Sequence, residues 1–225
     1  MNMDIYGVIV SFLYFYLVLI TAQKIGKNVE ISRKYAHIMI GNWYIIAILV
    51  FRKLVPSLIV PTFFAVYGAD SIYFRKKEDF ITSLLRKGNG SGIGIVLFPI
   101  SLIIMLISSF LYYHSFVPGG IGVMALTYGD SMAALIGETL PIFCFTINNK
   151  KKSLFGCTAM TIFSMISIFL YEQLFYSRLP YEISFPALIV IGVVAGIIEL
   201  ITPSGFDNLS IPVAIFACYI LLGII

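Results

Sequence analysis

Charged residues are scarce in this sequence. Asp, Glu, Lys and Arg make up 12% of its 225 residues, whereas soluble domains carry about 25%. Hydrophobic residues make up 60%, and the mean hydropathy is +0.98. A soluble core of this size cannot bury so much apolar surface. The composition therefore excludes an ordinary soluble domain and indicates a protein whose solvent is lipid.

Cysteine is also rare, and its placement excludes two classes of site. The three cysteines, Cys144, Cys157 and Cys218, form no CxxC pair and no cluster with histidine. A disulfide framework or a structural zinc site is therefore not expected. We interpret these cysteines as small apolar residues of helices.

The alternating pattern of membrane strands is absent. Such strands alternate over about 10 residues, whereas the apolar runs here are long and continuous. About 20 apolar residues span a bilayer as a helix, which satisfies its own backbone hydrogen bonds. We therefore predict one all-α domain over residues 1–225, a polytopic transmembrane bundle of about seven or eight spans. The expected helices cover residues 5–22, 35–51, 54–69, 93–113, 116–136, 157–176, 183–202 and 209–225.

The first apolar run lacks a basic stretch before it and an Ala-x-Ala cleavage site, so we expect a retained helix and not a signal peptide. With eight spans, twelve Lys and Arg residues lie on one side of the membrane, and only Arg52, Lys53 and Arg178 lie on the other. Basic loops stay in the cytoplasm. The richer side is thus predicted to be cytoplasmic, with the N-terminus outside.

The second expected helix opens with an ionisable cluster on that cytoplasmic side. Arg33 and His37 are four residues apart and share one helical face, with Lys34 beside them. Such a cluster can simply contact anionic lipid headgroups. His37, however, lies inside the apolar boundary, where an ionisable group is costly, so we favour a functional role.

The fifth expected helix carries a carboxylate, Asp130, in an otherwise apolar stretch. A carboxylate at this depth indicates a Mg²⁺ ligand or a proton acceptor. The alternative is a buried aspartate paired only with a neighbouring lysine. Small residues on the same face allow close approach by a helix or a ligand; they are Ala133, Ala134 and Gly137.

A lysine run precedes the sixth expected helix. Lys151 and Lys152 are candidate phosphate contacts, and Ser153 is a candidate N-cap, at a helix end that favours phosphate. A lysine run beside a membrane can also be only a topology signal. The Gly-rich segment 86–94, RKGNGSGIG, lacks the P-loop pattern, and a flexible loop is an equal interpretation.

The last cytoplasmic connection carries Glu199, Asp207 and Asn208, whose oxygens suit Mg²⁺. Alternatively, Asp207 or Asn208 only caps the final helix. One membrane face thus offers cations, carboxylates and glycines in successive segments. Because phosphoryl transfer depends on positioning and electrostatic stabilisation, we predict an enzyme that acts on a phosphorylated, water-soluble donor and a lipid acceptor.

In these segments the sequence resembles the membrane kinase family that includes dolichol kinase, phytol kinase and the CTP-dependent diacylglycerol kinase. Four ordered patches, over roughly residues 31–213, carry the resemblance. They are Arg33-Lys34-x-x-His37 with Gly41; Gly129-Asp130-Ser131 with Ala133, Ala134 and Gly137; Lys152-Ser153-x-x-Gly156; and Glu199 with Asp207-Asn208-x-Ser210-x-Pro212. The chain departs from the family at PIFCFTINN, which is more apolar than the usual charged turn.

The resemblance implies transfer of a nucleotide γ-phosphate, typically from CTP, to a lipid alcohol such as a polyprenol, a phytol-like alcohol or diacylglycerol. Asp130, His37 and Asp207 are then the expected catalytic residues. Asp130, Asp207 and Glu199 are the expected ligands of Mg²⁺. The residues expected at the nucleotide phosphates are Arg33, Lys34, Lys151, Lys152, Ser153, Gly129 and Asn208.

Two other functions stay open at this point. A CTP:phosphatidate cytidylyltransferase-like enzyme would combine the same reactants, although the sequence lacks an Asp-rich C-terminal signature with His-Gly. A small membrane transporter would favour inverted repeats and polar groups at mid-membrane, whereas the polar groups here gather at one face. The expected partners are nucleotide, lipid alcohol and membrane lipid, without nucleic acid.

Overall fold

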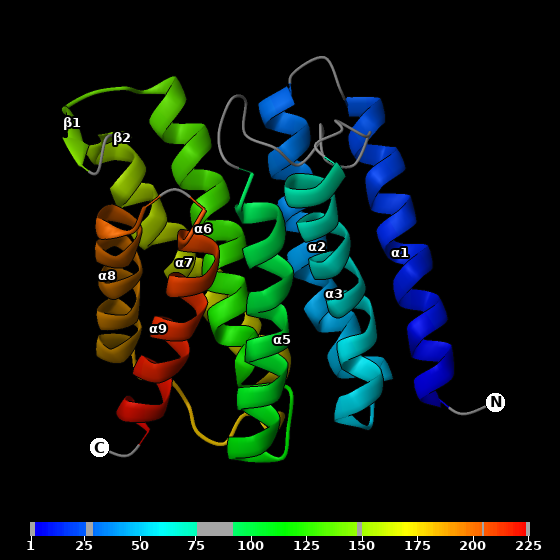
Figure 1. The fold of residues 1–225 in the computed structure, drawn as a ribbon. Helices are drawn as coiled ribbons and strands as arrows, with labels where there is room; N and C mark the ends of the chain where they lie inside the picture. The colour runs from blue at the N-terminus through cyan, green and yellow to red at the C-terminus, as the bar shows by residue number, and fades with distance from the viewer. Residues whose placement is uncertain (1–2, 26–28, 76–91, 148–149, 204, 224–225) are drawn as a thin grey trace.

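A computed structural model describes residues 3–25, 29–75, 92–147, 150–203 and 205–223. Within these ranges the chain forms a bundle of eight α-helices and one short β-hairpin (Figure 1). The α-helices are α1 Met3–Ile25, α2 Val29–Val50, α3 Leu54–Ala69, α5 Gly94–Tyr113, α6 Gly119–Thr139, α7 Leu154–Phe175, α8 Phe185–Ile201 and α9 Asp207–Leu222. A π-helix, η1 Asp70–Arg75, continues α3, and a 3-10 turn, η2 Tyr176–Arg178, follows α7. The all-α prediction is confirmed.

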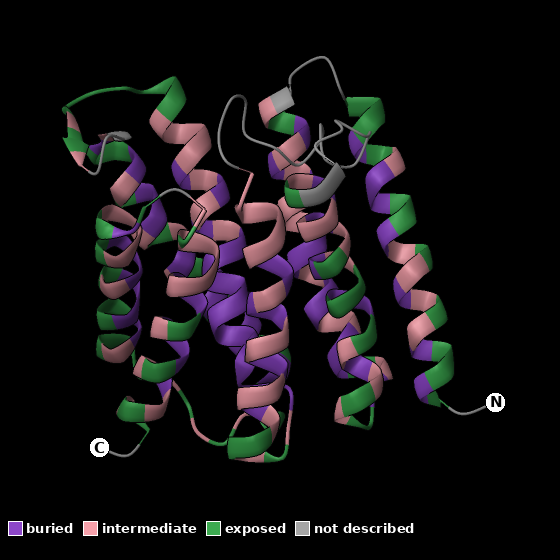
Figure 2. Ribbon diagram, in the orientation of Figure 1, coloured by how far each residue is buried: buried purple, intermediate pink, exposed green. Residues whose placement is uncertain are grey.

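The helices show the surface of a membrane protein. Large apolar side chains lie exposed on the outer faces of the bundle, as on Leu13 and Leu170, while the buried residues run along its centre (Figure 2). Five helical segments of the described chain are long and apolar enough to cross a membrane. They are Met3–Ile25, Leu54–Tyr73, Gly94–Tyr113, Gly119–Thr139 and Leu154–Arg178. Helices α8 and α9 are apolar but shorter.

Helix α6 forms the centre of the bundle, because small residues let its neighbours approach it closely. Its first half, from Gly119 to Thr127, is buried all round. At Gly122 an added Cβ would lie 3.1 Å from Cα of Pro212, so α9 packs directly on the α6 backbone. At Gly41 an added Cβ would overlap the Thr127 side chain, so α2 is equally close. These contacts set the distance between the ionisable residues of α2, α6 and α9.

The segment between the fifth and sixth expected helices carries secondary structure in its described residues, 137–147 and 150–156. Helix α6 continues to Thr139, and strands β1 Cys144–Ile147 and β2 Lys150–Ser153 pair antiparallel, with Cys144 opposite Ser153. Helix α7 then begins at Leu154. Ser153 is its N-cap, as predicted, since Ser153 Oγ accepts the N–H of Gly156 at 3.1 Å.

The start of α2 also differs from the prediction. The helix begins at residue 29 and not at 35, because Glu30, Arg33 and Lys34 continue it as a charged turn. At α9 the N-cap is Phe206, and it makes no side-chain capping bond. Oδ1 of Asp207 accepts the N–H of Asn208 at 3.0 Å in the first turn of this helix, so the alternative in which Asp207 or Asn208 only caps it stays a prediction.

Candidate functional site

A cavity of about 550 Å³ lies at one end of the bundle, where α2, α7 and α9 begin and α6 and α8 end (Figure 1). All four polar segments of the sequence reach its wall: Arg33 from α2, Asp130 from α6, Lys152 from β2 and Asp207 from α9. The structure thus brings residues of all four segments together at one cavity.

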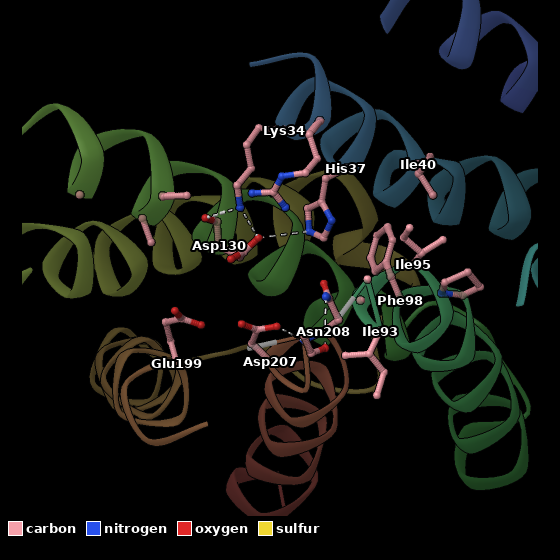
Figure 3. A pocket seen from close by; sticks show the side chains of 18 of the residues that line it. Lys34, His37, Ile40, Ile93, Ile95, Phe98, Asp130, Glu199, Asp207 and Asn208 are labelled. Atoms are coloured by element: carbon pink, nitrogen blue, oxygen red, sulfur yellow. Dashed lines mark hydrogen bonds and ion pairs between the residues drawn. The ribbon is translucent and has the colours of Figure 1, made fainter. Parts of the chain in front are cut away.

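Three carboxylates meet in the cavity. Asp130, Glu199 and Asp207 come from three different helices, and one oxygen of each lies within 4.8 Å of the others. Figure 3 shows Asp130 facing Glu199 and Asp207 across the cavity. Carboxylates this close raise each other's energy when ionised unless cations neutralise them. The cluster therefore needs positive charge to form.

The cluster has dimensions that suit Mg²⁺. Oxygen ligands bind Mg²⁺ at about 2.1 Å, so two ligands on opposite sides of the ion lie about 4.2 Å apart. The three carboxylate oxygens lie within 4.8 Å of one another, which is close to the reach of one ion. In addition, Oε2 of Glu199 is buried and has no hydrogen-bond partner among the described residues. A buried carboxylate oxygen without a partner is costly, and a cation would satisfy it.

Two lysines neutralise part of this negative charge. Nζ of Lys34, whose side chain is only 3% exposed, lies 2.6 Å from Oδ2 of Asp130 and 3.2 Å from its backbone oxygen. Nζ of Lys152 lies 3.0 Å from Oε1 of Glu199 and also donates to its backbone carbonyl. Asp130 thus pairs with a lysine, but not with a lysine alone, because two further carboxylates and a histidine share its site.

His37 is the histidine beside Asp130. Its Nε2 lies 3.7 Å from Oδ2 of Asp130, which is beyond hydrogen-bond distance, and has no hydrogen-bond partner among the described residues. Its ring stacks on Phe98, with centroids 4.3 Å apart and planes at 26°. The ring is therefore held in place by packing, and its Nε2 faces Asp130 without a hydrogen bond (Figure 3).

Arg33 and Asn208 also line the cavity. Nε of Arg33 donates to Glu30 at 3.0 Å, and its Nη2 binds the same carboxylate. Nδ2 of Asn208 donates to the carbonyl of Gly205 at 3.3 Å. Both side chains keep further donors or acceptors for a ligand.

The remaining predicted phosphate contacts, Ser153, Gly129 and Lys151, do not all reach the cavity wall in the described structure. Ser153 reaches the cavity wall, but its hydroxyl is used as the α7 cap. Gly129 faces away from the cavity, since an added Cβ would lie 2.7 Å from Sδ of Met160 on α7. It serves helix packing in this structure. The side chain of Lys151 lies outside the described residues.

Several wall residues were missed by the sequence analysis. Gly92 and Gly94, at the end of the Gly-rich segment, line the cavity together with Gly205. Gly205 has φ +88°, a conformation that side chains rarely adopt, and a Cβ on Gly94 would lie 2.8 Å from Nδ2 of Asn208. The glycine cluster itself was the available signal. The residues of the apolar wall, such as Phe15 and Phe64, had no signal in the sequence. An aromatic residue in an apolar helix has the same pattern whether it faces lipid or a cavity.

The chain matches no family model, no curated protein and no solved structure. The site itself and the four sequence patches that meet in it are therefore the basis for assigning a function.

Proposed function

We propose that this protein is a membrane phosphotransferase, a lipid-alcohol kinase that transfers the γ-phosphate of a nucleotide to the hydroxyl of a lipid alcohol. One observation carries the proposal. Three carboxylates from three helices converge beside lysines in a cavity whose other wall is apolar. Such a cavity suits a reaction between a charged phosphate and an apolar acceptor. CTP is the donor used by the family that the sequence resembles.

The chain's own residues fit the donor phosphates. Asp130, Glu199 and Asp207 would hold Mg²⁺, which supplies neutralisation of phosphate charge when bound. Arg33, Lys34 and Lys152 place further positive charge along the same cavity. Lys151 is kept as a phosphate contact on the sequence pattern alone.

His37 is the proposed proton acceptor. The acceptor oxygen attacks the γ-phosphorus while its proton passes to Nε2 of His37. The bond from the γ-phosphorus to its bridging oxygen breaks, and the nucleoside diphosphate leaves. The uncommitted Nε2 beside Asp130 supports this role, since the carboxylate stabilises the imidazolium that forms.

The test is one assay on purified protein in detergent. Labelled CTP or ATP is supplied with Mg²⁺ and a panel of polyprenol, phytol-like and diacylglycerol acceptors, and the products are a phosphorylated lipid and a nucleoside diphosphate. Asp207→Asn should lose the product, whereas Glu182→Gln, an exposed carboxylate at the opposite end, should retain it. Release of pyrophosphate with a lipid phosphate acceptor would instead indicate a cytidylyltransferase. Alcohol-independent solute uptake without nucleotide consumption would indicate a transporter.

We also propose that all eight α-helices cross the membrane, with the cavity facing the cytoplasm and the N-terminus outside. The excess of Lys and Arg in the connections at the cavity end supports this orientation. Cys144 is exposed on β1 at that end and is a natural reporter. With Cys157 and Cys218 changed to serine, Cys144 should react with an impermeant thiol reagent only after the cytoplasmic face is opened. Lys53→Cys and Arg178→Cys, in a background that also has Cys144→Ser, should react in intact cells. Reaction of Cys144 from outside would reverse the orientation and separate the site from cytoplasmic nucleotide.

A further inference from the structure

The cavity continues beyond its charged part into an apolar arm. Its walls come from α1, α2, α3 and α5, on the other side of the cavity from the carboxylates. Figure 3 shows this division, with Ile40, Ile95 and Phe98 on one side and Glu199 and Asp207 on the other. The arm is defined by Phe15, Leu19, Ile40, Phe64 and Phe98. The proposed chemistry uses none of these side chains except Phe98, which supports His37.

A pair of aromatic rings forms the floor of this arm. Phe15 and Phe64 are stacked, with centroids 4.5 Å apart and planes at 19°. Behind Phe15 lies Trp43, fully buried, with its ring centroid 5.8 Å from that of Phe15. Trp43 follows His37 by six residues in α2, which places it about 9 Å deeper in the bundle at 1.5 Å per residue. The arm therefore runs from the proposed proton acceptor into the bundle, towards Phe15 and the layer of Trp43.

We propose that the apolar arm binds the hydrocarbon segment that adjoins the acceptor's hydroxyl, with the Phe15–Phe64 stack as its floor. The inference rests on the proposed lipid-alcohol acceptor and names how it is held. The arm opens into the charged part of the same cavity, so its occupant must carry a polar group at one end. A water-soluble donor has no hydrocarbon to cover these walls, whereas an alkyl or isoprenoid chain gains by leaving water or lipid headgroups for them. Its hydroxyl then lies beside His37 and Asp130.

Trp43 allows a direct test, because it is the only tryptophan of the chain. Lipid alcohols that carry bromine, a short-range fluorescence quencher, are prepared with the bromine beside the hydroxyl, at roughly 9 Å along the chain, or at the far end of a long chain. They are added to the purified protein in detergent without nucleotide. Quenching should be largest for the middle position. Unbrominated alcohol should reverse it, and the corresponding hydrocarbon without a hydroxyl should not.

A variant with a matched control adds a second readout. Phe64→Ala removes half of the floor, so the position of strongest quenching should move further along the chain. The KM for the alcohol should rise about tenfold, as expected for loss of one aromatic contact, with the KM for nucleotide unchanged. Phe169→Ala removes a phenylalanine of the same size from the exposed face of α7 and should change neither value. The quenching profile of the unmodified protein decides the matter if Phe64→Ala does not fold.

Equal quenching from all three bromine positions, or quenching that unbrominated alcohol does not reverse, would place the chain in bulk detergent or lipid and overturn the proposal. Because binding is measured without nucleotide, the two proposals can fail separately. Position-dependent, reversible quenching without formation of a lipid phosphate would retain the arm and remove the kinase. Lipid phosphate formation without position-dependent quenching would retain the kinase and remove the arm.

Discussion

The two ends of the helix bundle both bury carboxylates, but they use them differently. At the end away from the cavity, Glu172 accepts the backbone N–H of Ile183 at 2.5 Å, and Asp4 accepts that of Arg52 at 2.8 Å. Each of these two buried carboxylates accepts a hydrogen bond from a backbone N–H in a connection between helices. At the cavity end, Asp130 and Glu199 face lysine side chains instead.

The tyrosines at the far end also form hydrogen bonds that hold a connection between helices in place. Tyr113 and Tyr181 share a hydrogen bond of 2.9 Å, and Tyr181 donates to the carbonyl of Tyr219 at 2.6 Å. These bonds tie the connection after α7 to α5 and α9. Burial also raises the pKa of Tyr181 above its ordinary value. Polar side chains at the far end thus bind the connections between helices, whereas carboxylates at the cavity end pair with lysines and can also bind a cation.

The sharpest test of this difference is Asp130→Asn. The amide keeps the shape of the side chain and an acceptor for Lys34, but it binds a divalent cation weakly. We expect transfer to fall by about 10²–10³-fold, as for loss of one electrostatic group at a reacting phosphate, while the protein stays folded and inserted. Turnover of lipid alcohol and gel-filtration behaviour in detergent are the measurements. Turnover near that of the unmodified protein would remove Asp130 from the site.

His37→Ala should have the next largest effect. Loss of a positioned proton acceptor typically costs about 10²-fold, and the packing against Phe98 is lost as well. The measurement is kcat for lipid phosphate formation as a function of pH, with His114→Ala, an exposed histidine at the opposite end, as the control. If His37→Ala keeps full activity and only Arg33→Ala fails, His37 is a boundary residue and another group takes the proton.

Lys34→Met should strengthen the binding of a divalent cation, by a smaller factor than the losses of activity expected for Asp130→Asn and His37→Ala. Lys34 occupies an oxygen of Asp130 that a metal ion would share, so removing its charge removes a competitor. Mn²⁺, titrated as a substitute for Mg²⁺ by electron paramagnetic resonance, should bind about tenfold more tightly, a change of about 1.4 kcal/mol. Lys53→Met, on the exposed connection at the far end, should leave the affinity unchanged. Weaker binding to Lys34→Met would show that the lysine does not compete for the carboxylate.

Glu172→Gln, the matching substitution at the far end, should affect stability and not chemistry. The hydrogen bond to Ile183 becomes neutral, at a cost of about 1 kcal/mol, which corresponds to about 2–4 °C in thermal unfolding for a chain of this length. Activity per folded molecule should not change. A selective loss of activity at full stability would contradict the division between the two ends.

Parts of the fold follow from hydropathy alone. Helix α3 begins and ends at the predicted residues 54 and 69, because apolar runs bounded by polar turns have few alternatives in lipid. The predicted start of α2 at residue 35 is too late because Arg33 and Lys34 interrupt the apolar run, although they are helical. They stay helical since their side chains turn into the cavity and not into lipid. The hairpin was missed because four-residue strands carry little periodicity.

The site was predictable to the same limited degree. Asp130 and His37 are indicated by the sequence alone, because ionisable residues in apolar helices are costly. Their partners depend on how α6, α8 and α9 cross, and this depends on close contacts such as Gly122 against Pro212. Gly129 shows the opposite case. It belongs to the same sequence patch as Asp130, but one residue further round the helix it faces α7.

The carboxylates come from α6, α8 and α9, and this has a consequence for biosynthesis. A chain that has been inserted only as far as α6 carries Asp130 with its Lys34 partner and neither of the other two carboxylates. Helices α8 and α9, which follow α6 in the chain, therefore complete the cluster. The proposed kinase activity therefore requires both α8 and α9 to pack against α6.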